Sequence, residues 1–266
     1  MKKNSSDRAF ETKSETFDLQ ISSDSGLCNF EFYFSIKATI KTLLFLVFAL
    51  ILASIITQFT LYFLPHYPLK FTLIRLFNLD GEANIPSVYS TSALLFCSIL
   101  LGIIARSKKL VGNRYFRHWQ SLSIVFLFLS LDELVSLHEI LMYSMEGATY
   151  SKGFFYFAWV IPGAIFAFCC LLAFIKLLAS LPSQTRYLFL SAGTIFLTGV
   201  LGFEMLGGYY ASFYGQDNMT YSIFTTIEES LEMLGTVVFI YALLSYLNSY
   251  VKEIGCRVRI IDKNFT

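Results

Sequence analysis

Six long apolar stretches, separated by short polar segments, dominate the pattern of hydrophobic positions along the chain. They cover residues 38–64, 87–105, 119–142, 154–180, 186–207 and 222–248. Each is close to the roughly 20 residues that an α-helix needs to cross a bilayer. The first stretch is too long for the apolar core of a signal peptide, so it is expected to remain as a span. The pattern predicts an all-α, polytopic membrane helix bundle of about six transmembrane helices.

The polar segments divide the chain into a membrane domain with two tails. Residues 1–36 mix Ser, Lys, Glu and Asp, which predicts a largely disordered cytoplasmic tail. Residues 37–249 form the six-span domain, and residues 250–266 form a basic cytoplasmic tail. The segment of about 66–86 contains a short helix-like pattern at 71–79. Because this pattern is too short to cross, it predicts an interfacial helix on the outer surface.

Composition and charge support a membrane location and set an orientation. Of the 266 residues, 55% are hydrophobic and 15% are charged, against about 25% charged in soluble domains. All of the 20 Lys and Arg residues except Lys70, Arg75 and Lys152 lie on one side of this topology. The positive-inside rule places that side, with both termini, in the cytoplasm, and the protein is expected in the cytoplasmic (inner) membrane. The N-terminal tail carries six acids beside its Lys and Arg residues, so no nucleic-acid partner is expected.

Seven carboxylates interrupt the predicted spans, and no Lys or Arg accompanies them there. They are Asp132, Glu133, Glu139, Glu204, Glu228, Glu229 and Glu232. An ionisable side chain at bilayer depth costs at least ~2.5–3.5 kcal/mol on insertion scales, which makes such residues candidates for function. Given the alternating span directions, all seven are expected at or outside the membrane midplane. Three spans would then contribute acids to one cavity that faces outward.

Helical geometry assigns faces to these acids. At about 100° per residue, Asp132, Ser136 and Glu139 share one face of the third span. Glu228, Glu229 and Glu232 lie on one polar arc of the sixth span. Glu204 stands alone on the fifth span, beside glycines, and is the weakest member of the predicted cluster.

A divalent cation would allow these acids to remain ionised together. Carboxylate oxygens suit hard ions such as Mn²⁺, Ca²⁺ or Mg²⁺, and His138 beside Glu139 would also permit iron or zinc. We therefore expect a metal site formed by Asp132, Glu133, His138, Glu139, Glu204, Glu228, Glu229 and Glu232. The chemistry expected of it is hydrolytic or redox work on a lipid or another apolar substrate. The pattern leaves open a proton- or cation-coupled transporter or channel and a non-catalytic membrane scaffold, and it gives no oligomeric state.

Three segments resemble a group of uncharacterised bacterial polytopic membrane proteins. The segments are LSLDELVSLHEIL at 129–141, which contains an SLDExxxLHE-type signature, GEANIPSVYS at 81–90 and IEESLEMLG at 227–235. The resemblance implies a bacterial membrane protein, and it implies no activity.

Overall fold

Helices make up the membrane domain. The computed structural model describes residues 35–137, 140 and 152–250. In chain order the elements are α1 (Ile36–Phe63), α2 (Lys70–Phe77), α3 (Ile85–Leu110), α4 (Phe116–Val135), the 3₁₀ turn η1 (Gly153–Phe155), α6 (Val160–Ser180), α7 (Ser183–Leu197), the π-helical segment η2 (Thr198–Phe203), α8 (Glu204–Tyr214) and α9 (Met219–Tyr250). No strand occurs among the described residues. The all-α prediction is confirmed, and the short helix predicted at 71–79 corresponds to α2.

Five helices in the described part of the chain are long and apolar enough to cross a membrane. They are α1, α3, α6, the continuous helix Ser183–Tyr214 and α9. The helix α4, in the third predicted span, is not among the five, since its 20 residues include Arg117, Asp132 and Glu133. Large apolar side chains are exposed along α1 and α6, as Phe45 and Phe168 illustrate, and this suits contact with lipid.

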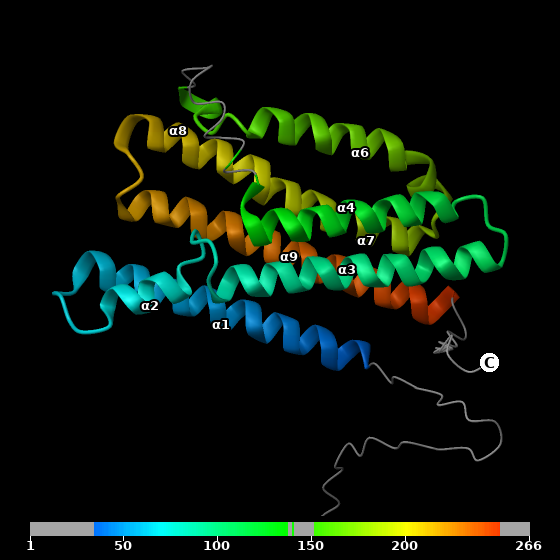
Figure 1. Ribbon diagram of the computed structural model, residues 1–266, viewed down its shortest axis with the longest axis horizontal. Helices are drawn as coiled ribbons and strands as arrows, with labels where there is room; N and C mark the ends of the chain where they lie inside the picture. The colour runs from blue at the N-terminus through cyan, green and yellow to red at the C-terminus, as the bar shows by residue number, and fades with distance from the viewer. Residues whose placement is uncertain (1–34, 138–139, 141–151, 251–266) are drawn as a thin grey trace, which may run out of the picture. The chain divides into compact units, whose positions relative to one another are not determined.

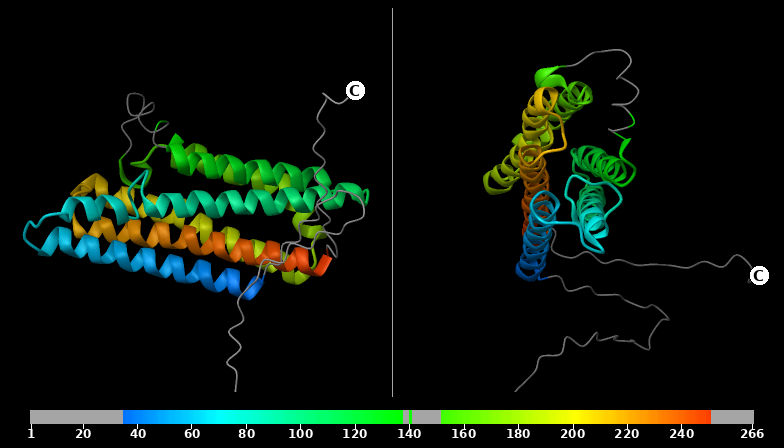
Figure 2. Two further views of the ribbon diagram at one scale, coloured as in Figure 1. Left: turned by 60° about the horizontal axis from the view of Figure 1, so that its bottom comes forward. Right: turned by 90° about the vertical axis from the view of Figure 1, so that its left-hand side faces the viewer.

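The helices form two layers, which Figure 1 and the end-on view of Figure 2 show. One layer contains α1, α9, the α7–η2–α8 helix and α6 in that order, and the other contains α3 and α4. The helix α9 is central because α1, α3 and α7 all pack against it. Among the described helices, α4 packs its backbone most extensively against α3.

Small polar side chains hold α3 and α4 together. Ser98 Oγ donates to the Ser123 carbonyl and Ser123 Oγ donates to the Ser98 carbonyl, each at 2.8 Å. Such residues let helix backbones approach closely inside a membrane. At the end near the α3–α4 turn, aromatic rings join this pair to α9: Trp119 packs on Tyr246 at 5.2 Å, and Phe126 stacks on Phe239 at 4.6 Å between ring centroids.

The helix ends follow local chemistry, and one differs from the sequence prediction. Asn84 caps α3 in a reciprocal pair with Ser87, which satisfies backbone N–H groups of the first turn. The helix α4 ends at Val135, where Ser136 adopts a left-handed conformation with φ of 54°. The prediction that Ser136 continues the helical face of Asp132 is therefore wrong. His138 and Glu139 lie outside the described residues.

Two glycines let the α7–η2–α8 helix press against α9. A Cβ atom at Gly199 would lie 2.7 Å from the Glu228 carbonyl oxygen, and one at Gly235 would lie 2.8 Å from the Phe196 backbone nitrogen. Both positions are closer than a real Cβ atom tolerates against backbone. Gly199 also lies in η2, so the close approach coincides with the π-helical turn.

We predict that Gly235→Ala destabilises the bundle by about 1–3 kcal/mol, because the added methyl group overpacks against the backbone of Phe196. Gly193→Ala on α7 is the matched control, since a Cβ there meets nothing within 4 Å. That change is expected to be neutral or stabilising by about 0.5–1 kcal/mol. Thermal unfolding of the detergent-purified variants measures both, and equal melting temperatures for the two variants would contradict the proposed close contact.

Candidate functional site

A cavity of about 990 Å³ lies between the two helix layers. Its walls come from α3 and α4 on one side and from α6, α7, η2, α8 and α9 on the other, with the Leu79–Glu82 turn at one end. Ligand sites for small molecules have volumes of about 300–1,000 Å³, so this cavity has the size of a binding site.

Carboxylates gather at the end of the cavity near the Leu79–Glu82 turn. Those that line it are Asp80, Glu82, Asp132, Glu133, Glu204, Glu228, Glu229 and Glu232. Six of the eight residues in the predicted metal site thus share one cavity, and the other two, His138 and Glu139, lie outside the described residues. Asp80 and Glu82 were not in the predicted site. They precede the Asn84 cap of α3, and their sequence pattern is that of an ordinary polar turn.

Glu204 begins α8 directly after the π-helical segment and points toward α6 and α9. Its Oε1 accepts a hydrogen bond of 2.7 Å from the indole N–H of Trp159. The indole lies against Gly163, where a Cβ atom would come within 2.9 Å of the ring. Sequence reasoning missed Trp159, because a tryptophan near the end of a predicted span is typical of a membrane-interface anchor. Glu204 was expected to be the weakest member, yet it lies within the cluster.

Contacts across helices connect the glutamates of α9 to the other acids. The carboxyl groups of Glu228 and Glu204 are within hydrogen-bonding reach of each other. Glu232 interacts electrostatically with Asp132 and Glu133 of α4. The close approach at Gly199, which lies against Glu228 and Glu232, holds η2 beside this part of α9. The acids of three helices therefore act on one another as a single cluster.

The charge of this cluster is one-sided. No Lys, Arg or His is among the described residues that line the cavity. Glu228 is buried and Glu204, Glu229 and Glu232 are half-buried, so water screens their charges incompletely. Like charges that are crowded together in a poorly hydrated site disfavour simultaneous ionisation. The cluster therefore favours protons or a cation.

The described side chains do not form a ready-made metal cage. Within that part of the chain, no group of three or more His, Cys, Asp or Glu side chains is arranged to hold a metal ion. The expected cage of many protein ligands around one ion is thus not supported by this arrangement. Any ion here would need side-chain rotation, or ligands contributed by a bound molecule.

The rest of the cavity is apolar. Its walls beyond the acids are formed mainly by Phe, Leu, Ile and Val side chains, among them Phe126, Phe174, Phe189 and Phe239. Phe128 of α4 and Phe166 of α6 face each other with ring centroids 6.0 Å apart, and both are exposed while lining the cavity. The boundary between α4 and α6 is therefore a thin wall of side chains between the cavity and the surrounding lipid.

The Leu79–Glu82 turn and the end of α4 meet at the acidic end. Ser136 Oγ donates a hydrogen bond to Glu82 Oε2, which links the two segments. Its left-handed backbone ends α4 three residues after Glu133. If the helix had continued to residue 142, as the sequence predicts, Ser136 would have lain on the same helical face as Asp132.

Fold and site together define a class, a multi-helix membrane protein with an acidic, partly apolar internal cavity. Residues 42–247 match the family model described as Domain of unknown function (DUF8692), so the chain belongs to that family. No curated protein and no solved structure matches the chain. The expected membership of an uncharacterised family is confirmed.

A double-mutant cycle tests the contact that fixes Glu204. We predict a coupling of about 1–3 kcal/mol between Trp159→Phe and Glu204→Leu, because each change alone removes the same 2.7 Å hydrogen bond. The free energy of unfolding in mixed micelles titrated with denaturing detergent gives the coupling. In the control cycle, Glu232→Leu replaces Glu204→Leu and its coupling to Trp159→Phe should be close to zero. Equal coupling in both cycles would refute a specific contact.

Proposed function

We propose that this protein is a divalent-cation-dependent membrane enzyme that binds a lipid-like substrate in the cavity and acts on its polar end. The observation that carries the proposal is the division of one cavity into a carboxylate end and an apolar remainder. An amphipathic molecule matches both parts, since its chain lies against apolar side chains while its polar end reaches the acids.

A cation at the acidic end follows from the balance of charge. Glu204, Glu228, Glu229 and Glu232 form no ion pair with a described Lys, Arg or His. At low effective dielectric, the repulsion among them falls most when a divalent ion lies between them. The same ion would attract an anionic substrate group that the carboxylates alone repel.

The donor set favours a hard ion. The carboxylates offer only oxygen ligands, which suit Mg²⁺, Ca²⁺ and Mn²⁺ better than softer metals. Mg²⁺ in particular binds through one or two carboxylates together with substrate phosphate oxygens. Such sharing fits a site in which three protein ligands are not already assembled. The ion would supply Lewis-acid polarisation of a phosphoryl or carbonyl oxygen.

The apolar part indicates how a substrate would enter. Phe128 and Phe166 are exposed at the boundary between α4 and α6, and α4 packs its backbone mainly against α3. A small rotation of these side chains would open the cavity sideways to lipid. A lipid chain entering here would remain in an apolar environment throughout.

The distribution of acids favours catalysis over cation transport. All Asp and Glu residues of the described chain that line the cavity lie at its end near the Leu79–Glu82 turn. Toward the α3–α4 turn the described wall carries no acid and is aromatic, with Phe126 stacked on Phe239 and Phe189 packed against the same ring. A transported cation would need further polar ligands along that path.

Reporter fusions test the orientation, in which both termini face the cytoplasm of the inner membrane and the acidic end faces outward. A fusion after Gly215, in the α8–α9 connection, should report the outside. A fusion after Lys109, in the last turn of α3, should report the inside, because Arg106, Lys108 and Lys109 lie at this end of the helix. If both fusions reported the same side of the membrane, the chain could not cross the membrane an odd number of times between them, and the proposed topology would be wrong.

Metal analysis tests the proposed cation. Detergent-purified protein dialysed against Mg²⁺, Mn²⁺ or Ca²⁺ should retain one of these ions, and Glu232→Gln should lose most of it, because an amide is a poorer ligand than a carboxylate. A chelator should lower the melting temperature of the wild-type protein, since it removes ligand-linked stabilisation. Elemental analysis and thermal unfolding measure the two effects.

Asp217→Asn is the matched control, because Asp217 is exposed in the α8–α9 connection and does not line the cavity. It should keep the wild-type metal content and the wild-type response to the chelator. A metal-free wild-type protein whose Glu232→Gln variant melts at a higher temperature would overturn the proposal. That result would indicate an empty cluster in which removal of one acid relieves repulsion.

A further inference from the structure

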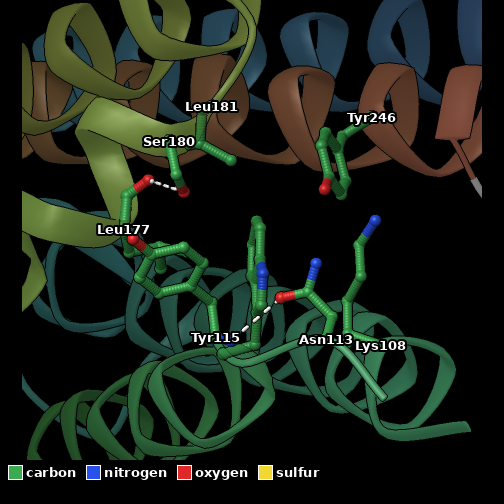
Figure 3. Close-up of a pocket in the computed structure, with 8 residues that line it drawn as sticks. Lys108, Asn113, Tyr115, Leu177, Ser180, Leu181 and Tyr246 are labelled. Atoms are coloured by element: carbon green, nitrogen blue, oxygen red, sulfur yellow. Dashed lines mark hydrogen bonds between the residues drawn. The ribbon is translucent and has the colours of Figure 1, made fainter. Parts of the chain in front are cut away.

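A second, smaller cavity of about 230 Å³ lies at the end of the bundle where α3 turns into α4. It is lined by Lys108 and Asn113, Tyr115 and Trp119, Leu177, Ser180 and Leu181, and Tyr246. Figure 3 shows Lys108, Asn113 and Tyr115 from the α3–α4 hairpin facing Ser180 and Leu181 at the end of α6, with Tyr246 of α9 beside them. Three separate parts of the fold thus surround one space.

The polar groups of this cavity are mostly hydrogen-bond donors. Trp119 is 1% exposed and Tyr246 is 6% exposed, and neither the indole N–H nor that hydroxyl is hydrogen-bonded to any described residue. Neither donor atom is fully enclosed, so both are open to a ligand in the cavity. Lys108 Nζ lies 5.1 Å from the centre of the Tyr246 ring. Buried polar groups normally have partners. Two nearly buried donors on a cavity wall, beside an ammonium group, indicate a ligand that accepts hydrogen bonds.

The surrounding charge has the same sign. The described residues of the α3–α4 connection and its flanks include Arg106, Lys109, Arg114 and Arg117, with Lys176 and Arg186 near the end of α6. No Asp or Glu occurs in the described segments 85–131 and 160–203, which contain every residue lining this cavity except Tyr246. The ligand is therefore expected to be an anion.

We propose that this cavity binds a phosphate group, either on the headgroup of an anionic lipid or as free phosphate. Lys108 would supply the charge, and the Trp119 N–H and Tyr246 hydroxyl would donate hydrogen bonds to its oxygens. The size of the cavity suits a phosphate with part of a headgroup but not a whole lipid. Basic pockets between transmembrane helices are a recognised setting for anionic headgroups. This site is separate from the acidic cluster and does not depend on the proposed function.

Tryptophan fluorescence measures binding directly. The chain has 2 tryptophans, so Trp159→Phe leaves Trp119, in the wall of this cavity, as the sole reporter. Delipidated protein in detergent is titrated with inorganic phosphate, with phosphatidylglycerol and with diacylglycerol, which has the same chains without phosphate. A saturable change with phosphatidylglycerol and with phosphate would show that phosphate suffices, and a change with phosphatidylglycerol alone would assign the site to lipid.

Variants in the same Trp159→Phe background decide whether the named residues bind. Lys108→Gln should weaken binding by about tenfold or more, since it removes the charged donor. Tyr246→Phe keeps the ring packing but removes the hydroxyl donor, and it should also weaken binding. This variant tests the proposal if Lys108→Gln fails to fold. Lys109→Gln removes the same charge from an exposed neighbour that does not line the cavity, and its affinity should stay within about twofold.

Three results would overturn the proposal. One is the absence of a saturable change with either phosphate-bearing probe. Another is an equal change with diacylglycerol, which would indicate binding of the chains alone. The third is wild-type affinity in both Lys108→Gln and Tyr246→Phe.

Discussion

The close contact of the α7–η2–α8 helix with α9, at Gly199 and Gly235, governs the position of the acidic cluster. A side chain at either glycine would meet backbone atoms at less than 3 Å, so the two helices can lie this close only where Cβ atoms are absent. The contact brings Glu204 beside Glu228 and places Glu232 next to the acids of α4. Repulsion among these carboxylates opposes the same contact, so packing must outweigh it, or protons or a cation must relieve it.

Charge is separated along the bundle. The acids of the described chain gather near the Leu79–Glu82 turn and the α8–α9 connection, and the cations concentrate around the α3–α4 turn. Between them lies an aromatic layer in which Trp119, Phe126, Phe189 and Phe239 tie α4 and α7 to α9. This layer separates an acidic, partly apolar cavity from a small basic one. The two cavities would then bind chemically different groups at opposite ends of one membrane domain.

The backbone of η2 explains why Glu204 was the weakest member of the cluster predicted from the sequence. Helical-wheel geometry assumes about 100° per residue, and a π-helical turn breaks that register immediately before Glu204. Helical-wheel geometry failed at Ser136, because it assumed a helix that continues to residue 142. In the structure, α4 ends at Val135. For Glu228, Glu229 and Glu232 the helix is regular, and all three line the cavity as their shared polar arc predicts. Trp159 and Asp80 gave no periodic signal at all.

The sequence by itself determined the helical class, the approximate extents of the long apolar helices and the residue types that would have to avoid lipid. These follow from local rules, since apolar length and the cost of burying charge are properties of each segment alone. The tertiary structure decided which acids meet, how Trp159 holds Glu204 and that a donor-lined cavity forms around Trp119 and Tyr246. Those features depend on the relative positions of helices that are far apart in the chain. Glycine contacts, a π turn and aromatic packing fix these positions, and none of them produces a periodic pattern in the sequence.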